Sequence, residues 1–233
     1  MIYLLVDSSA DIDTDKKEGY LHVPITITIG GKDYQSGIDL DSPTFYSLLT
    51  ESKEFPKTAQ PSPDAFATVF EQVKREGNQL IYFALSSALS GTYQSAQIAK
   101  DMVGYEEIYI IDTASLSYGI QLLTGAAENM RHSGHSAKEI THFCEGLKSK
   151  IRIVAGVDTL EYLYKGGRLS RASAAMGTMT NIKPVLTVTN EGVAQVIGKS
   201  LGKVRAMQAI LKFLQDNPAD TIYPFYTIYT LGE

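Results

Sequence analysis

Short apolar runs alternate with helix-initiation signals over the first 150 residues of this 233-residue chain. The first run, residues 2–6, contains no charged side chain and ends at Asp7, which is typical of a strand buried on both faces. Similar runs occur at 80–85 and 108–111, separated by segments of helical periodicity. Because parallel strands need crossover helices, the alternation predicts a three-layer α/β/α domain with a mainly parallel sheet.

Serine marks most of the expected helix starts. Ser42-Pro43 and Ser62-Pro63 each predict an N-cap followed by proline at the first helical position. Further helices are expected from Ser90, over 117–131 and over 136–150. Before them, the alternating residues 21–29 predict one strand that Gly30-Gly31 turns into a hairpin.

The pattern changes near residue 150, so we expect two domains, 1–150 and 151–233. The second is predicted to be an α/β domain with a mixed sheet. Its expected elements are a strand at 152–157, a helical turn at 160–164, a short helix from Ser170, a hairpin of 184–189 and 193–199, a helix at 201–215 and a strand at 222–229.

Charge is unevenly divided along the chain. Residues 1–147 carry 10 basic and 20 acidic side chains, whereas residues 148–212 carry 11 basic and 3 acidic ones. A basic segment on an acidic chain fits phosphate, an anionic membrane surface or an acidic partner protein. Charge balance between two packed halves explains the same numbers equally well.

Several classes of protein are disfavoured. No run approaches the ~20 apolar residues of a spanning helix, and the N-terminus lacks signal-peptide features, so we expect a cytoplasmic protein. The single cysteine excludes a Cys-rich zinc site, and we expect no metal, because the loosely spaced His132, His135, His142 and Cys144 straddle a turn between two predicted helices. Without tryptophan or an aromatic platform, nucleic acid binding has little support.

Three polar loops, residues 7–9, 58–63 and 86–92, follow expected strands or precede expected helices. In an open α/β sheet such loops converge on the ligand crevice. Ser90-Gly91-Thr92 would offer hydroxyls, backbone N–H groups and the positive end of a helix dipole to a carboxylate or phosphate. The simpler interpretation is that Ser62 and Ser90 only cap their helices.

Catalytic alternatives are weaker. A small-molecule hydrolase or transferase using Ser90 as nucleophile would lack both the G-x-S-x-G elbow and a histidine in any neighbouring motif. No Walker lysine follows the S-G-T sequence. The Lys165-Gly166-Gly167-Arg168 loop fits either a phosphate contact or a surface turn.

The chain resembles the DegV family of bacterial lipid-binding proteins along nearly its whole length. The resemblance lies in segments that follow the family's order: residues 7–11 (DSSAD), 58–63 (TAQPSP), 89–96 (LSGTYQSA), 112–113 with Gly119, 157–170 (VDTLEYLYKGGRLS) and 181–186 (NIKPVL). Each segment alone is weak, but together they are specific.

The resemblance implies two α/β domains that clamp one long-chain fatty acid, with no other cofactor. Its carboxylate would be held by Thr58 and Ser90, with Gly91 and Thr92 beside them. The protein would perform no chemistry itself. Instead it would present the carboxylate to a dihydroxyacetone-kinase-like fatty acid kinase in phospholipid metabolism, and exchange its lipid while transiently peripheral to an anionic membrane. The expected rim of the site, for ligand or partner, consists of Asp7, Ser8, Gln60, Lys165, Arg168 and Arg171.

Two departures from the family pattern matter. Ala59 stands where the family usually has serine, which removes one donor. Nothing like the family's final histidine-containing segment follows Tyr229, so the resemblance implies a sequence truncated at its C-terminus. A predicted last strand without a neighbour would leave a sheet edge exposed.

Overall fold

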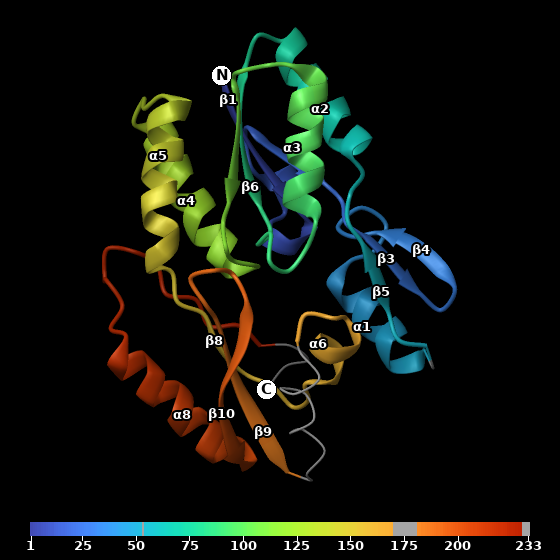
Figure 1. Ribbon diagram of the computed structural model, residues 1–233, viewed down its shortest axis with the longest axis vertical. Coiled ribbons are helices and arrows are strands. Elements are labelled where there is room, and N and C mark those ends of the chain that lie inside the picture. Colours follow the sequence, from blue (N-terminus) through green and yellow to red (C-terminus); the bar gives the residue numbers. More distant parts are fainter. Residues whose placement is uncertain (53, 170–180, 230–233) are drawn as a thin grey trace. The chain divides into compact units, whose positions relative to one another are not determined.

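The computed structural model describes residues 1–52, 54–169 and 181–229. The chain forms two compact units (Figure 1). The first comprises Met1–Ser149 together with residues 226–229, and the second comprises Lys150–Phe225. The sequence-based division had instead assigned residues 226–229 to the second part of the chain.

The first unit is built on a four-stranded parallel sheet in the order β2-β1-β6-β7. Helices α2 and α3 cover one face of this sheet, and α4 and α5 cover the other (Figure 1). The predicted α/β/α arrangement is therefore confirmed. The elements are β1 (Ile2–Asp7), β2 (Tyr20–Val23), β6 (Gln79–Ala84), β7 (Ile108–Asp112), α2 (Pro63–Arg75), α3 (Thr92–Val103), α4 (Tyr118–His132) and α5 (Ala137–Leu147).

Continuous apolar strands make sense in this sheet because both faces are covered. Leu5 and Tyr82 belong to the core beneath α2 and α3, where the Phe66 and Tyr82 rings lie 5.0 Å apart. Leu4 and Phe83, at the alternate strand positions, are also fully buried. Each such side chain contributes about 1.5–3 kcal/mol of burial free energy, so the central strands form a rigid base for the loops at their ends.

A separate antiparallel sheet, in the order β4-β3-β5, also belongs to the first unit. Its strands are β3 (Thr26–Ile29), β4 (Lys32–Gln35) and β5 (Lys57–Ala59), and α1 (Ser42–Glu51) lies between β4 and β5 in the chain. The single strand expected at 21–29 is wrong, since β2 and β3 belong to different sheets. Pro24 separates them and has no N–H to donate to a ladder. The hairpin at Gly30-Gly31 is confirmed, with φ of 58° and 74°.

Two of the predicted helix starts need correction. Helix α1 is capped by Asp41, whose Oδ1 accepts the Thr44 N–H at 2.9 Å, so Ser42 is already helical. Helix α3 starts at Thr92 after Gly91, so Ser90 lies outside its cap. The carboxylate of Asp41 competes successfully with the neighbouring serine because an ionised acceptor forms the stronger capping bond. Ser62 does cap α2, as predicted, and Ser136 caps α5.

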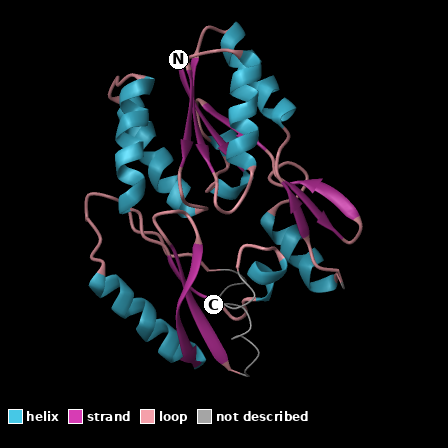
Figure 2. Ribbon diagram, in the orientation of Figure 1, coloured by secondary structure: helices cyan, strands magenta, loops and turns pink. Residues whose placement is uncertain are grey.

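The second unit contains a three-stranded sheet in the order β10-β9-β8 (Figure 2). All the described strand pairs in it are antiparallel, so the mixed sheet expected there is not found among these residues. The hairpin of β9 and β10 is confirmed, whereas the helix expected from Ser170 lies outside the described residues. The elements are β8 (Val154–Gly156), α6 (Glu161–Lys165), β9 (Ile182–Val188), β10 (Ala194–Leu201) and α8 (Gly202–Asp216).

Residues 222–229 form no strand, contrary to the prediction. Their aromatic and β-branched side chains fit a paired, half-buried surface, but no described strand pairs with them. Ile222 and Tyr229 are 77% and 67% exposed. Tyr226 instead lies with the first unit, its ring centroid 5.0 Å from that of Tyr118.

Helix α8 is amphipathic. Ala206 is buried in the second unit, whereas Val204, Met207 and Leu211 are exposed. At 15 residues, α8 and α4 are the longest helices described. Within the described ranges, no helix has the length and apolar composition needed to cross a bilayer.

Candidate ligand-binding site

The segment that follows β5 lies directly against the start of α3. Gln60 Nε2 donates to the buried Ser95 Oγ at 2.9 Å. A side-chain carbon placed on Gly91 would lie 2.1 Å from Gln60 Oε1, so the amide would have to move to admit any other residue there. The structure thus brings together two of the three predicted polar segments, 58–63 and 86–92.

Thr58 and Ser90 lie in different local environments. Thr58 is exposed on β5, an edge strand, where it lies opposite Ile27 of β3. It therefore belongs to a strand and not to the predicted loop. Ser90 is half-buried, and its Oγ lies 2.7 Å from Thr92 Oγ1 and accepts the Thr92 N–H at 3.3 Å. Since Thr92 is fully buried, Ser90 is the more accessible hydroxyl of this pair.

The start of α3 suits an anion. Gly91 is the N-cap and provides no side-chain acceptor for the first turn of this 12-residue helix. Such a terminus combines backbone N–H donors with the positive end of the helix dipole. A hydrolase using Ser90 would need a base beside the hydroxyl, whereas the side-chain partner described here is another hydroxyl, that of Thr92.

Asp7 organises the carboxyl end of the sheet. Its buried carboxylate accepts Ser9 N–H at 2.9 Å and Ser9 Oγ–H at 2.5 Å on one oxygen. The other oxygen accepts the Tyr82 hydroxyl at 2.6 Å and Leu85 N–H at 3.2 Å. Both oxygens are thus engaged within the protein, which gives Asp7 a structural role at the rim expected there.

Ser8 is similarly engaged. Its hydroxyl donates to the Ser36 carbonyl and accepts the Ile25 N–H, each at 2.9 Å, and lies 3.2 Å from His22 Nε2. Burial lowers the pKa of His22, against the opposing effect of the negative charges of Asp7 and Asp15. Sequence reasoning missed His22, because a single histidine in a strand carries no signal of its contacts.

Asp112 joins the loops that follow β6 and β7. Its carboxylate accepts Ser87 N–H at 3.1 Å, Ser87 Oγ–H at 2.5 Å and Ala114 N–H at 3.0 Å. These bonds fix the beginning of the loop that leads to Ser90. Asp112 was noted in the sequence only as part of the family resemblance.

The K-G-G-R loop belongs to the second unit and ends α6. Lys165 Nζ forms an ion pair with Glu161 Oε1 at 2.5 Å, and Arg168 Nη1 donates to the Gly166 carbonyl. Gly167 has φ of 78°, so its conformation favours glycine. Lys165 and Arg168 are exposed, while Arg171 lies outside the described residues. Their association with Thr58 and Ser90 stays a prediction.

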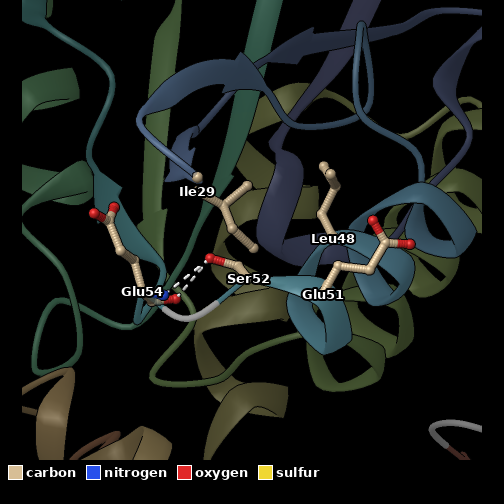
Figure 3. Close-up of a pocket in the computed structure, with 6 residues that line it drawn as sticks. Ile29, Leu48, Glu51, Ser52 and Glu54 are labelled. Carbon is tan, nitrogen blue, oxygen red and sulfur yellow. Dashed lines mark hydrogen bonds between the residues drawn. The ribbon is translucent and has the colours of Figure 1, made fainter.

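A cavity of about 330 Å³ opens beside the antiparallel sheet of the first unit (Figure 3). Ile29 and Leu48 provide apolar walls, and the Ser52 hydroxyl bonds both the N–H and the carbonyl of Glu54 at 3.1 Å. Glu51, Glu54 and Gly30 complete the lining, which includes neither Thr58 nor Ser90. The polar rim makes this cavity a poor match to an entire lipid tail.

The described residues contain no group of three or more side chains arranged to hold a metal ion. Cys144 faces the core of the first unit, with Sγ 3.9 Å from the Leu123 carbonyl. Burial raises the pKa of this thiol to about 12.

These observations define a class of two-unit α/β protein. The first unit has a parallel α/β/α sheet and a helix start lined by hydroxyls, and the second unit is smaller. The model of an uncharacterised protein family, DegV, matches residues 1–233. A DegV domain-containing protein from Caldanaerobacter subterraneus subsp. tengcongensis is 39% identical over 221 residues, which cover 94% of this chain and 78% of that protein. The chain belongs to the DegV family, as its motifs predicted.

Two solved structures are similar to this chain. A fatty acid binding DegV family protein from Thermus thermophilus is 31% identical with a TM-score of 0.82, and the match covers 92% of this chain and 77% of that one. A fatty acid binding DegV family protein from Streptococcus agalactiae is 29% identical with a TM-score of 0.83, covering 94% and 79%. Both similarities extend over the two units of the fold.

Proposed function

We propose that this chain binds one long-chain fatty acid and holds the carboxylate through the hydroxyls of Thr58 and Ser90. The observation that carries the proposal is the packing of Gln60 on Gly91 and Ser95, which links the strand of Thr58 to the loop of Ser90. The fatty acid binding of two similar DegV family proteins supports it.

The proposed anchor relies on charge-assisted hydrogen bonds. Hydroxyl donors to a carboxylate form bonds of about 1.5–3 kcal/mol, stronger than bonds between neutral groups. Helix α3 adds the positive end of its dipole. Its N-cap, Gly91, has no side chain to accept from the first turn, although Ser90 Oγ accepts the Thr92 N–H. Ala59 contributes no donor, so the anchor rests on fewer hydroxyls than the family usually has.

The apolar tail would supply most of the affinity. Burying some 15 methylenes at about 0.8 kcal/mol each gives about 12 kcal/mol before costs. Association and ordering offset roughly 4–15 kcal/mol of this gain. The hydroxyls would therefore determine which end of the lipid lies beside α3.

A titration with a fluorescent long-chain fatty acid tests the anchor. The Thr58→Ala/Ser90→Ala variant should bind more weakly than wild type while keeping its circular dichroism spectrum. The matched control is Thr68→Ala/Ser133→Ala, which removes two exposed hydroxyls of the same unit. Equal affinity of the two double variants would overturn the anchoring role.

The protein itself performs no chemistry in this proposal. It presents the carboxylate to a dihydroxyacetone-kinase-like fatty acid kinase, which forms the acyl phosphate for phospholipid metabolism. Arg168 would lie at the rim, because a guanidinium can bind phosphate oxygens with two N–H groups at once. Gln60 lies beside Gly91 at the same proposed site, and Arg171 would add charge at the rim.

Kinase turnover separates this role from lipid binding. Arg168→Ala should slow phosphorylation of the bound lipid without releasing it, whereas Arg75→Ala, which removes an exposed cation at the end of α2, should leave the rate unchanged. If the lipid bound to Arg168→Ala is phosphorylated at the wild-type rate, Arg168 has no role at the rim and the K-G-G-R loop is only a surface turn.

We also propose transient contact with an anionic membrane, where the lipid is exchanged. Helix α8 exposes Val204, Met207 and Leu211 alongside the cations Lys203, Arg205 and Lys212. Each basic residue near such a surface adds about 1 kcal/mol of attraction at low salt. Replacing the three cations by glutamine should slow exchange with anionic vesicles but not with neutral ones. A triple variant that exchanges lipid with anionic vesicles at the wild-type rate would contradict the proposal.

A further inference from the structure

One hydroxyl joins three segments of the first unit. Ser8 follows β1 of the parallel sheet, His22 is on the neighbouring β2, Ile25 immediately precedes β3, and Ser36 immediately follows β4. The Ser8 Oγ bonds reach all three partners over 2.9–3.2 Å. Ile25 and Ser36 also bond to each other, through Ser36 N–H to the Ile25 carbonyl at 3.0 Å.

Counting protons assigns the direction of each bond. A serine hydroxyl has a single proton, and Ser8 donates it to the Ser36 carbonyl. The Ile25 N–H occupies one lone pair of the same oxygen. His22 must therefore donate from Nε2–H to the remaining lone pair, which leaves Ser8 saturated and unsuited to act as a nucleophile.

These bonds hold the base of the β3–β4 hairpin at the carboxyl end of β1. Strand β3 in turn pairs with β5, with Ile27 opposite Thr58. On the far side of Thr58, Gln60 bonds Ser95 of α3. Strand β5 is thus held at two points, through β3 by Ser8 and through Gln60 by α3.

We propose that Ser8 and His22, joined at the base of the β3–β4 hairpin, are positioning residues that hold the strand of Thr58 in register with the loop of Ser90. The consequence for lipid binding rests on the proposed function, whereas the consequence for strand placement does not. His22 packs closely here, since a side-chain carbon on Gly37 would lie 3.3 Å from His22 Cε1. Neither Ser8 nor His22 touches the ligand in this account.

A distance measurement tests the placement without any ligand. Spin labels are attached to Lys57→Cys on β5 and Gln94→Cys on α3, two exposed positions, while the buried Cys144 stays unlabelled. The background is varied as Ser8→Ala, His22→Leu and His22→Gln, with Ser47→Ala on α1 as the matched serine control. Gln retains an N–H donor at the reach of His Nε2, so it is the conservative replacement.

We expect a broader or shifted distribution of label-to-label distances in Ser8→Ala and His22→Leu. In His22→Gln and Ser47→Ala, the distances should equal those of the labelled protein that carries no further substitution. Affinity for a fluorescent fatty acid should fall about tenfold in the first two variants and recover in His22→Gln, because losing a partly buried hydrogen bond costs about 1.4 kcal/mol. Equal distances in all backgrounds would overturn the positioning role, whatever the lipid result. Failure of the unvaried protein to bind lipid, with distances changing as expected, would overturn only the proposed function.

Discussion

Gly91 lies so close to the Gln60 amide that a side chain at position 91 would force this amide to move: a carbon placed there lies 2.1 Å from Gln60 Oε1. In its present position the amide donates to Ser95 Oγ and so links the end of β5 to α3. Gly91→Ala should therefore displace Gln60, break its bond to Ser95 and weaken fatty acid binding about tenfold. A fluorescent fatty acid titration measures the loss.

A second substitution at Gln60 serves as the control. Gly91→Ala should lower the melting temperature because the new side chain clashes with the Gln60 amide, and Gly91→Ala/Gln60→Ala, in which the clash is absent, should melt at a higher temperature than Gly91→Ala alone. If Gly91→Ala by itself leaves both melting temperature and affinity unchanged, the close packing is not a constraint on the site.

Tyr82→Phe should destabilise the first unit by about 1–3 kcal/mol, because the buried Asp7 carboxylate loses its 2.6 Å hydrogen bond from the hydroxyl. Tyr3→Phe is the matched control, since the Tyr3 hydroxyl bonds Glu76 at the surface and its loss should cost within about 0.5 kcal/mol. Urea denaturation monitored by circular dichroism compares the two. Equal losses for both variants would contradict the role of Asp7 in holding the strand end.

His22 should make stability sensitive to mild acid. Because burial lowers the pKa of His22 in the folded protein, the unfolded chain takes up the proton first, near the ordinary value of 6.5. The free energy of unfolding should then fall as the pH drops below 6.5, although the facing carboxylates Asp7 and Asp15 oppose part of the effect. Glutamine does not titrate. In urea titrations, the free energy of unfolding of His22→Gln minus that of wild type should therefore increase as the pH is lowered from 7.5 to 5.5. A constant difference between the two proteins across this range would refute the assignment.

Cys144 should resist thiol reagents in the folded protein. Its pKa of about 12, raised from 9.0 by burial, reduces the thiolate fraction about a thousandfold at a given pH. Reaction with Ellman's reagent should follow unfolding, so it should be slow in buffer and rapid in denaturant. Rapid stoichiometric labelling of the native protein would show that the thiol is accessible.

Much of the fold could be predicted because burial leaves a clear pattern. The strands beginning at Ile2, Gln79 and Ile108 each contain a continuous apolar run, as a sheet covered on both faces requires. Strand β5 escaped prediction, since its three residues are exposed and have no periodicity. Residues 222–229 show the opposite failure, because strand-forming side chains do not make a strand without a partner.

The candidate site was predictable in its segments but not in its contacts. The rule that loops at the ends of parallel strands converge predicted the loop of Ser90, which follows β6, whereas Thr58 lies on a strand of the antiparallel sheet. Which side chains meet depends on register and rotamer, so neither the Gln60–Ser95 bond nor the Ser8–His22 pair could be read from the sequence. Asp7 and Ser8 were expected at a rim; both bond to protein groups in the structure, and their place at the rim of a ligand site stays a prediction.

Native mass spectrometry of the protein purified from bacterial cells tests the central claim most directly. The account predicts a species heavier than the 25.5 kDa chain by the mass of one long-chain fatty acid, and depletion of that species in Thr58→Ala/Ser90→Ala. A wild-type chain free of lipid, or a double variant that retains it fully, would contradict the account.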